Sequence, residues 1–143
     1  MRARRKRSST VHRVRGSRLR IYISGPMRNR PFFNFAAFDE AAAQLAELGH
    51  TPISPAESSR WLVRECGFDP ACESDYAKVS LETYMEDDIR AMRHADCVVL
   101  LPGWQRSRGA RVEIAYARFR SIPVYTLKDF LMLDRIERRE HAA

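Results

Sequence analysis

The chain has 143 residues, of which 45% are hydrophobic and 30% charged, and these values suit one globular domain with a single core. No stretch approaches the ~18 consecutive apolar residues of a membrane helix, so the sequence predicts a soluble protein with no membrane partner. The net charge of +7 is unevenly placed, because residues 1–20 hold nine Lys or Arg and no acid. The other 123 residues hold 16 basic and 18 acidic side chains, so they offer no broad basic surface for nucleic acid.

Residues 1–18 are expected to be a basic tail in front of a domain that takes residues 19–143. The tail lacks the apolar core of a secretory signal peptide. Three interpretations stay open: a solvated arm without fixed structure, an arm that touches nucleic acid weakly and without sequence preference, or a start codon placed too early.

The cysteines and histidines give no sign of a metal site. Cys66 and Cys72 have five residues between them, which does not suit a zinc knuckle, and the four histidines are scattered. Cys97 lies in an apolar run and is expected in the core. An odd number of cysteines favours a reduced, intracellular chain, and we expect it in the cytoplasm with no protein-held metal.

In chain order, the apolar patterns predict strand 19–24, helix 31–49, strand 50–55, helix 81–95, strand 96–101, helix 109–120, strand 122–127 and helix 129–140. "LRIYIS" alternates, whereas "DCVVLL" is a continuous apolar run, which is typical of a strand buried on both faces. Residues 56–79 show no clear period. A long loop is expected there, with at most a short helix from about Arg60 to Arg64.

Strands that alternate with helices predict an α/β fold: a small, doubly wound parallel sheet with helices on both faces. Ligands of such folds bind beyond the carboxyl ends of the strands, where the strand order reverses. Two unusual loops follow predicted strands there, "SGPMRNR" after the first strand and "PGWQRSRG" after the third. These loops are the candidate binding region.

Ser107, Arg108 and Gly109 precede the helix predicted from residue 109. The free amides of a helix start, a serine hydroxyl, a glycine and the charge of Arg106 or Arg108 could together bind a phosphate. The simpler alternative is that Ser107 caps the helix while the arginines point into water.

Glu113 lies about one turn inside the same helix. As a first-turn acid it would simply favour the helix dipole, by ~0.3–1 kcal/mol. Alternatively, the dipole and the nearby arginines would keep it ionised beside a phosphate pocket. An ionised carboxylate there could attack a sugar carbon or stabilise an oxocarbenium-like centre.

Three adjacent acids, Glu86, Asp87 and Asp88, lie near the start of the helix predicted at 81–95, and such acids usually form a solvated cap. Glycosidic cleavage needs a second carboxyl that assists the leaving group. Asp88 is our candidate, because it precedes Met92 by four residues and so lies near the buried side. Asp96 would lie at the opposite end of the sheet.

The segments "IYISGPMR", "DDIRAMRHADCVVLLPGW" and "SRGARVEIAYA" resemble the nucleoside 2-deoxyribosyltransferase superfamily. The similarity is greatest to its short, often phage-encoded members, and it extends to the deoxynucleoside 5′-monophosphate N-glycosidases. It covers about Arg20 to Leu127. The resemblance implies a flavodoxin-like fold of four, possibly five, strands and cleavage of a base–sugar bond.

The resemblance also implies residue roles. Glu113 would be the nucleophile, and Asp88 would handle the base or the sugar. The substrate would be bound by Tyr22, Gly25, Pro26, Met27, Arg28, Trp104, Ser107, Arg108 and Gly109. Among these, the start of the 109–120 helix would hold a 5′-phosphate, and Trp104 would stack on a base or simply pack.

Larger members of the superfamily have five strands and complete each site with a residue from a neighbouring subunit. Four strands are visible in this sequence, and no residue here maps onto that contribution. The resemblance therefore implies a homo-oligomer, a dimer or higher, whose form it leaves open.

The leading hypothesis is an enzyme that cleaves the N-glycosidic bond of a (deoxy)nucleoside 5′-monophosphate without a cofactor. Water as acceptor would make it a hydrolase, and a second base would make it a transferase. One alternative is a module of the same fold that binds or senses a nucleotide without turnover. Another is nucleic-acid binding through the tail, although the tail has no interleaved aromatic residues for stacking.

Overall fold

A computed structural model describes residues 17–142, so most of the expected basic tail lies outside the described residues. The strands are β1 (Arg20–Ser24), β2 (Thr51–Ile53), β3 (Cys97–Leu100) and β4 (Val124–Thr126). The α-helices are α1 (Phe35–Glu47), α2 (Pro55–Glu65), α3 (Leu81–Met92), α4 (Arg108–Phe119) and α5 (Leu127–Ala142). Three short 3-10 helices are η1 (Pro31–Asn34), η2 (Glu73–Lys78) and η3 (Trp104–Arg106).

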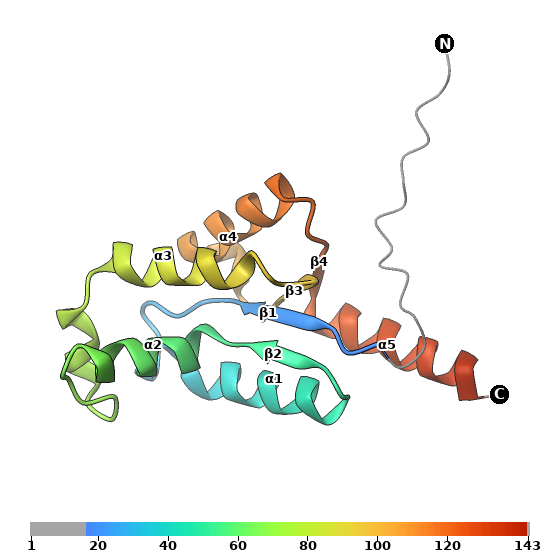
Figure 1. Ribbon diagram of the computed structural model, residues 1–143, viewed down its shortest axis with the longest axis horizontal. Helices are drawn as coiled ribbons and strands as arrows, with labels where there is room; N and C mark the ends of the chain where they lie inside the picture. The colour runs from blue at the N-terminus through green and yellow to red at the C-terminus, as the bar shows by residue number, and fades with distance from the viewer. Residues whose placement is uncertain (1–16, 143) are drawn as a thin grey trace, which may run out of the picture.

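The four strands form one sheet in the order β2-β1-β3-β4, and every neighbouring pair is parallel. From β1 the chain moves first to β2 on one side and then to β3 on the other, so the strand order reverses between β1 and β3. Both predictions of the fold, α/β class and a doubly wound parallel sheet, are confirmed, and the fold is flavodoxin-like with four strands (Figure 1).

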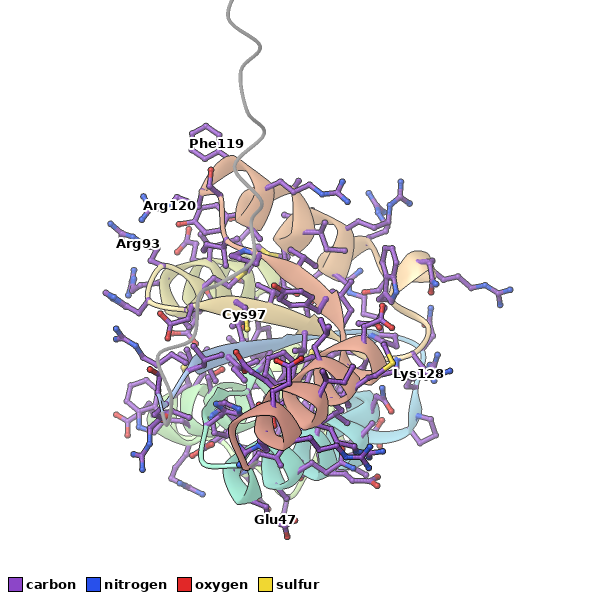
Figure 2. All side chains as sticks on the ribbon, turned by 90° about the vertical axis from the view of Figure 1, so that its right-hand side faces the viewer. Glu47, Arg93, Cys97, Phe119, Arg120 and Lys128 are labelled. Atoms are coloured by element: carbon purple, nitrogen blue, oxygen red, sulfur yellow. The ribbon has the colours of Figure 1, made fainter. Side chains whose placement is uncertain are left out.

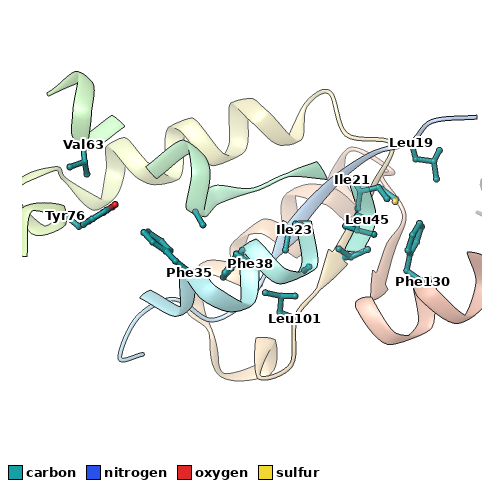
Figure 3. Packing of buried hydrophobic residues seen from close by; sticks show 14 of the residues in the cluster. Leu19, Ile21, Ile23, Phe35, Phe38, Leu45, Val63, Tyr76, Leu101 and Phe130 are labelled. Carbon is teal, nitrogen blue, oxygen red and sulfur yellow. The ribbon is translucent and has the colours of Figure 1, made fainter. Parts of the chain in front are cut away.

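The two faces of the sheet carry different helices (Figure 1). The larger hydrophobic cluster joins Ile21 and Ile23 of β1 to α1, α2 and α5. Figure 3 shows the part of this cluster where Phe35 and Phe38 of α1 approach β1 and Leu101. The smaller cluster lies on the opposite face under α3 and α4, because successive strand residues such as Ile21 and Tyr22 point to opposite sides.

The expected loop at 56–79 is a wrong prediction over much of its length. Helix α2 starts at Pro55 and runs to Glu65, with Ser54 at its N-cap position, and η2 follows. The buried side of α2 is made by small residues such as Ala56 and Ser59, while Trp61 is 55% exposed. The apolar pattern of this segment therefore hid the helix instead of revealing it.

The helix predicted at 31–49 begins later than expected. Phe32, Phe33 and Asn34 have φ values of 42°, 55° and 61°, in the left-handed region, so α1 starts only at Phe35. The Asn34 side chain donates to the carbonyl oxygen of Pro26 at 3.0 Å and closes the loop after β1. Phe32 and Phe33 pack edge-on or tilted against Tyr76 of η2, so aromatic contacts hold the turn.

Helix α5 is attached to the amino end of the sheet by a buried polar group. His50 Nε2 lies 3.0 Å from Asp134 Oδ1, and the Leu19 amide donates to His50 Nδ1 at 3.3 Å. Arg138 Nε donates to the other oxygen of Asp134 at 2.6 Å, and its Nη2 donates to the carbonyl oxygen of Leu48. These bonds tie α5 to residues on both sides of α1 and β1.

Other expectations concern single residues. Cys97 is buried in β3, as predicted, and all three cysteines are free thiols. Asp96 lies at the amino end of the sheet, as expected, where its Oδ2 accepts from the Arg20 amide at 2.7 Å. None of the helices within residues 17–142 has the length and apolar character needed to cross a bilayer.

Candidate functional site

The candidate site lies where the carboxyl ends of β1 and β3 meet. The Leu101 amide donates to the carbonyl oxygen of Ser24 at 2.8 Å, so the loops that leave the two strands start side by side. A Cβ on Gly25 would lie 2.7 Å from the Leu101 Cβ, closer than real Cβ contacts allow. Gly25 is therefore fixed by close packing between the strand ends, at the point where doubly wound folds bind ligands.

Glu113 reaches this point from α4. Its side of the helix is buried together with Ala110, Ile114 and Ala117, and Glu113 itself is only 5% exposed. The helix begins at Arg108, so Glu113 lies in the second turn, and the expected first-turn position is wrong. A polar side chain buried this deeply needs partners of its own.

Those partners are two hydroxyls of β1. Tyr22 donates its phenolic hydrogen to Glu113 Oε2, and Ser24 donates to Oε1 at 3.1 Å. Tyr22 and Ser24 are two residues apart on one strand, so both face α4, and both are fully buried. Each oxygen of the carboxylate therefore has a fixed donor, and its orientation is set by the sheet.

Burial raises the pKa of Glu113 to about 7, although the hydrogen bonds from Tyr22 and Ser24 favour the charged form and lower it. We had expected the helix dipole and nearby arginines to keep Glu113 ionised. The groups that favour its charge are instead these hydroxyls. Tyr22 remains a donor, since burial and then the Glu113 charge raise its pKa well above the usual range.

Asp88 faces the same region from α3. Burial raises its pKa to about 8, and the negative charges of Glu113 and Asp87 add to this shift. Its neighbour one turn later, Met92, is fully buried, which agrees with the choice of Asp88 as the inward acid. Glu86 is exposed on the outer side of α3. The site thus combines two carboxyl groups that sense each other and that hold protons near neutral pH.

The start of α4 forms the rim of the site. Ser107 occupies the N-cap position, and its Oγ accepts from the Ala110 amide at 3.1 Å, which confirms the capping interpretation. The amides of Arg108 and Gly109 belong to the first turn and have no acceptor within the helix. A Cβ on Gly109 would meet nothing closer than Met85 Cε at 3.9 Å, so the backbone there is open to approach. Glu113 follows Ser107 by six residues, about 9 Å along the helix axis.

The remaining candidates of the first and third loops are more scattered. Pro26 is buried and held by Asn34, whereas Arg28 and Arg108 are exposed. Met27 packs against the larger cluster and not with Glu113. Trp104 is half-buried against the smaller cluster, as a packing tryptophan would be.

Sequence reasoning missed two residues of this region. Ser24 was not a candidate, although its position two residues after Tyr22 placed it on the same face of the strand. Arg30 was also missed: a Cβ on Gly103 would lie 2.7 Å from its Nη2, so the guanidinium passes directly over the third-strand loop. Gly103 has a φ of +88° and lacks a side chain that would block this contact.

The geometry suits proton transfer and nucleophilic attack by carboxylates. Within residues 17–142, no group of three or more His, Cys, Asp or Glu side chains is arranged to hold a metal ion. The described site offers two carboxyl groups, two hydroxyl donors and the open start of a helix, each of which can act on an organic substrate.

Comparison with known proteins gives the family of the chain and not its activity. A search of curated proteins found no match. Residues 19–126, from just before β1 to the end of β4, match a protein family described as "Domain of unknown function (DUF4406)". The matched range contains all four strands and every residue of the candidate site, and the protein therefore belongs to the DUF4406 family.

Proposed function

We propose that the protein cleaves the N-glycosidic bond of a (deoxy)nucleoside 5′-monophosphate, with Glu113 as nucleophile and Asp88 as general acid. The observation that carries the proposal is the buried Glu113 carboxylate, whose two oxygens accept from Tyr22 and Ser24 at the reversal of strand order. Two buried hydroxyls that favour the charged form of a carboxylate are a costly arrangement for a structural residue alone.

The different environments of the two carboxyls support different roles. The pKa of Glu113 is about 7 and that of Asp88 about 8, so on raising the pH Glu113 loses its proton first. The productive form has Glu113 ionised and Asp88 protonated, and the pair titrates as a coupled unit.

In the proposed reaction, a Glu113 oxygen attacks C1′ of the sugar while the C1′–N bond breaks. Its electrons go to the base, which takes the proton of Asp88. The resulting glycosyl ester is resolved when water attacks C1′, gives a proton to Asp88 and releases the Glu113 carboxylate. A second base in place of water would make the protein a transferase by the same steps.

The phosphate preference rests on the start of α4. The amides of Arg108 and Gly109 and the hydroxyl of Ser107 lie about 9 Å from Glu113 along the helix, which suits the distance from a 5′-phosphate to C1′. The side chains of Arg28 and Arg30 extend from the facing loop and add positive charge. A nucleotide substrate and the three free thiols both fit a cytoplasmic reaction.

The test is release of free base from a panel of ribo- and deoxyribonucleoside 5′-monophosphates, followed by chromatography with and without an acceptor base. The wild type should release base from at least one substrate, and Glu113→Gln should lower the rate by about 10⁴-fold or more. The matched control is Glu47→Gln, an exposed acid at the end of α1.

If no substrate of the panel yields base, the glycosidase proposal fails. A nucleotide that still binds to the wild type, measured by calorimetry, would then favour the binding module. Base release that survives in Glu113→Gln would instead remove Glu113 from the mechanism.

A further inference from the structure

The outer side of α3, away from the sheet, has an unpartnered surface that the proposed reaction does not use. A hollow of about 440 Å³ lies along it, lined by Glu82, Met85, Glu86, Ile89, Arg90 and Arg93. These residues recur every three or four positions and so form one continuous stripe along the helix. We call this surface the α3 stripe.

The α3 stripe has an apolar middle and charged ends. Met85 and Ile89 are half-buried at its centre, while the four charged side chains are exposed. Both acids, Glu82 and Glu86, precede both arginines, Arg90 and Arg93, along the helix. Among the described residues, none of these four charges forms an ion pair, even though Glu86 and Arg90 are one turn apart.

We propose that the α3 stripe binds the same stripe of a second copy of this chain, with the two α3 helices antiparallel about a two-fold axis. In that arrangement the acidic half of each helix faces the basic half of its partner, and the apolar centres meet. A parallel arrangement would place acid on acid and arginine on arginine. The inference does not depend on the proposed reaction.

Neighbouring residues enlarge the surface. Val112 and Phe119 of α4, the other helix on this face of the sheet, are 51% and 85% exposed. Figure 2 shows Phe119 at the same end of the molecule as Arg93 and Arg120, far from Glu47 of α1. Two helices thus present apolar side chains in one layer, which brings the contact toward the ~1,200 Å² or more that stable interfaces bury.

Self-association can be separated from folding by charge exchange between copies. The first variant, Glu82→Arg with Glu86→Arg, makes the stripe wholly basic. The second, Arg90→Glu with Arg93→Glu, makes it wholly acidic. Sedimentation equilibrium of the full chain should show a dimer for wild type and a rise of about a hundredfold or more in the dissociation constant of each variant alone.

The decisive sample is an equimolar mixture of the two variants, in which every charge across the interface is again opposite. We expect a heterodimer in the mixture, weakened by raised salt because the charges are exposed. The matched control is Glu40→Arg with Glu47→Arg on α1, which makes the same change in net charge and should leave the dimer intact. Circular dichroism of each variant checks that it is folded.

A wild type that stays monomeric at all concentrations would overturn the proposal. So would variants that remain dimeric alone, because the interface would then lie elsewhere. Monomeric variants that fail to associate in the mixture would overturn the antiparallel pairing. None of these outcomes bears on base release, so the proposal can fail while the proposed function stands.

Discussion

The two faces of the sheet differ in what their helices contribute. Among the described residues, the face under α1, α2 and α5 holds a cluster of 15 buried residues, whereas the face under α3 and α4 holds 6. The larger cluster is almost wholly apolar. Beside the smaller one lie a buried glutamate, its two hydroxyl donors and a carboxyl with a raised pKa.

This difference shows how a chain of modest length can hold buried charge. Removing a carboxylate from water is unfavourable even with hydrogen bonds, so the site destabilises its own face of the sheet. Apolar burial on the opposite face offsets that loss, because both faces share the same strands. Stability and chemistry are therefore separable, and mutations on the two faces should have different effects.

The largest effect is expected on the apolar face. Phe38→Ala removes a fully buried ring from α1 and should lower the free energy of unfolding by about 3–5 kcal/mol, measured by urea denaturation. Gln44→Ala, an exposed position on the same helix, is the control and should change it little. Equal effects of the two changes would mean that α1 does not pack as described.

The next effect concerns the acid of the site. Asp88→Asn should lower the rate of base release by about 10²-fold, because amide cannot supply the proton. The wild-type pH profile of kcat/KM should be bell-shaped, rising as Glu113 ionises near pH 7 and falling as Asp88 ionises near pH 8. The alkaline limb should disappear in Asp88→Asn.

Asp87→Asn is the matched control for Asp88. Loss of a neighbouring negative charge lowers the pKa of Asp88, so the alkaline limb should persist and move to lower pH. An unchanged profile in both variants would exclude Asp88 as the proton donor.

The smallest effect is expected at Ser24, a positioning residue. Ser24→Ala removes one donor to Glu113, which raises the pKa of the carboxyl and should lower the rate at neutral pH by about tenfold. The acid limb of the pH profile should move to higher pH, a change that a general loss of stability would not produce. Ser59→Ala, a buried serine of α2, should leave that limb in place.

The fold was largely predictable because its main signals are strong. The four strands and the inward side of α4 follow from apolar runs such as residues 97–100. Helix α2 was not found, because Trp61 is exposed while Ala56 and Ser59 are buried, which reverses the usual apolar pattern. A serine followed by proline was nevertheless a helix-start signal, here at Ser54.

The site was predictable only in part. Glu113 and Asp88 could be picked out from local spacing, but the partners of Glu113 lie 91 and 89 positions away in the chain. Only the pairing of strands brings Tyr22 and Ser24 beneath α4. The left-handed turn at Phe32 could not be foreseen either, because bulky residues rarely adopt positive φ.

The link between α5 and His50 has a consequence for where this protein can be cut. The family match ends at Thr126, yet Phe130 and Asp134 beyond it are buried against the sheet. A fragment trimmed to the matched residues would leave His50 without Asp134 and open the apolar core to water. The unit that similarity defines is thus shorter than the unit that folds, and expression of this domain for crystals or display should keep the last helix.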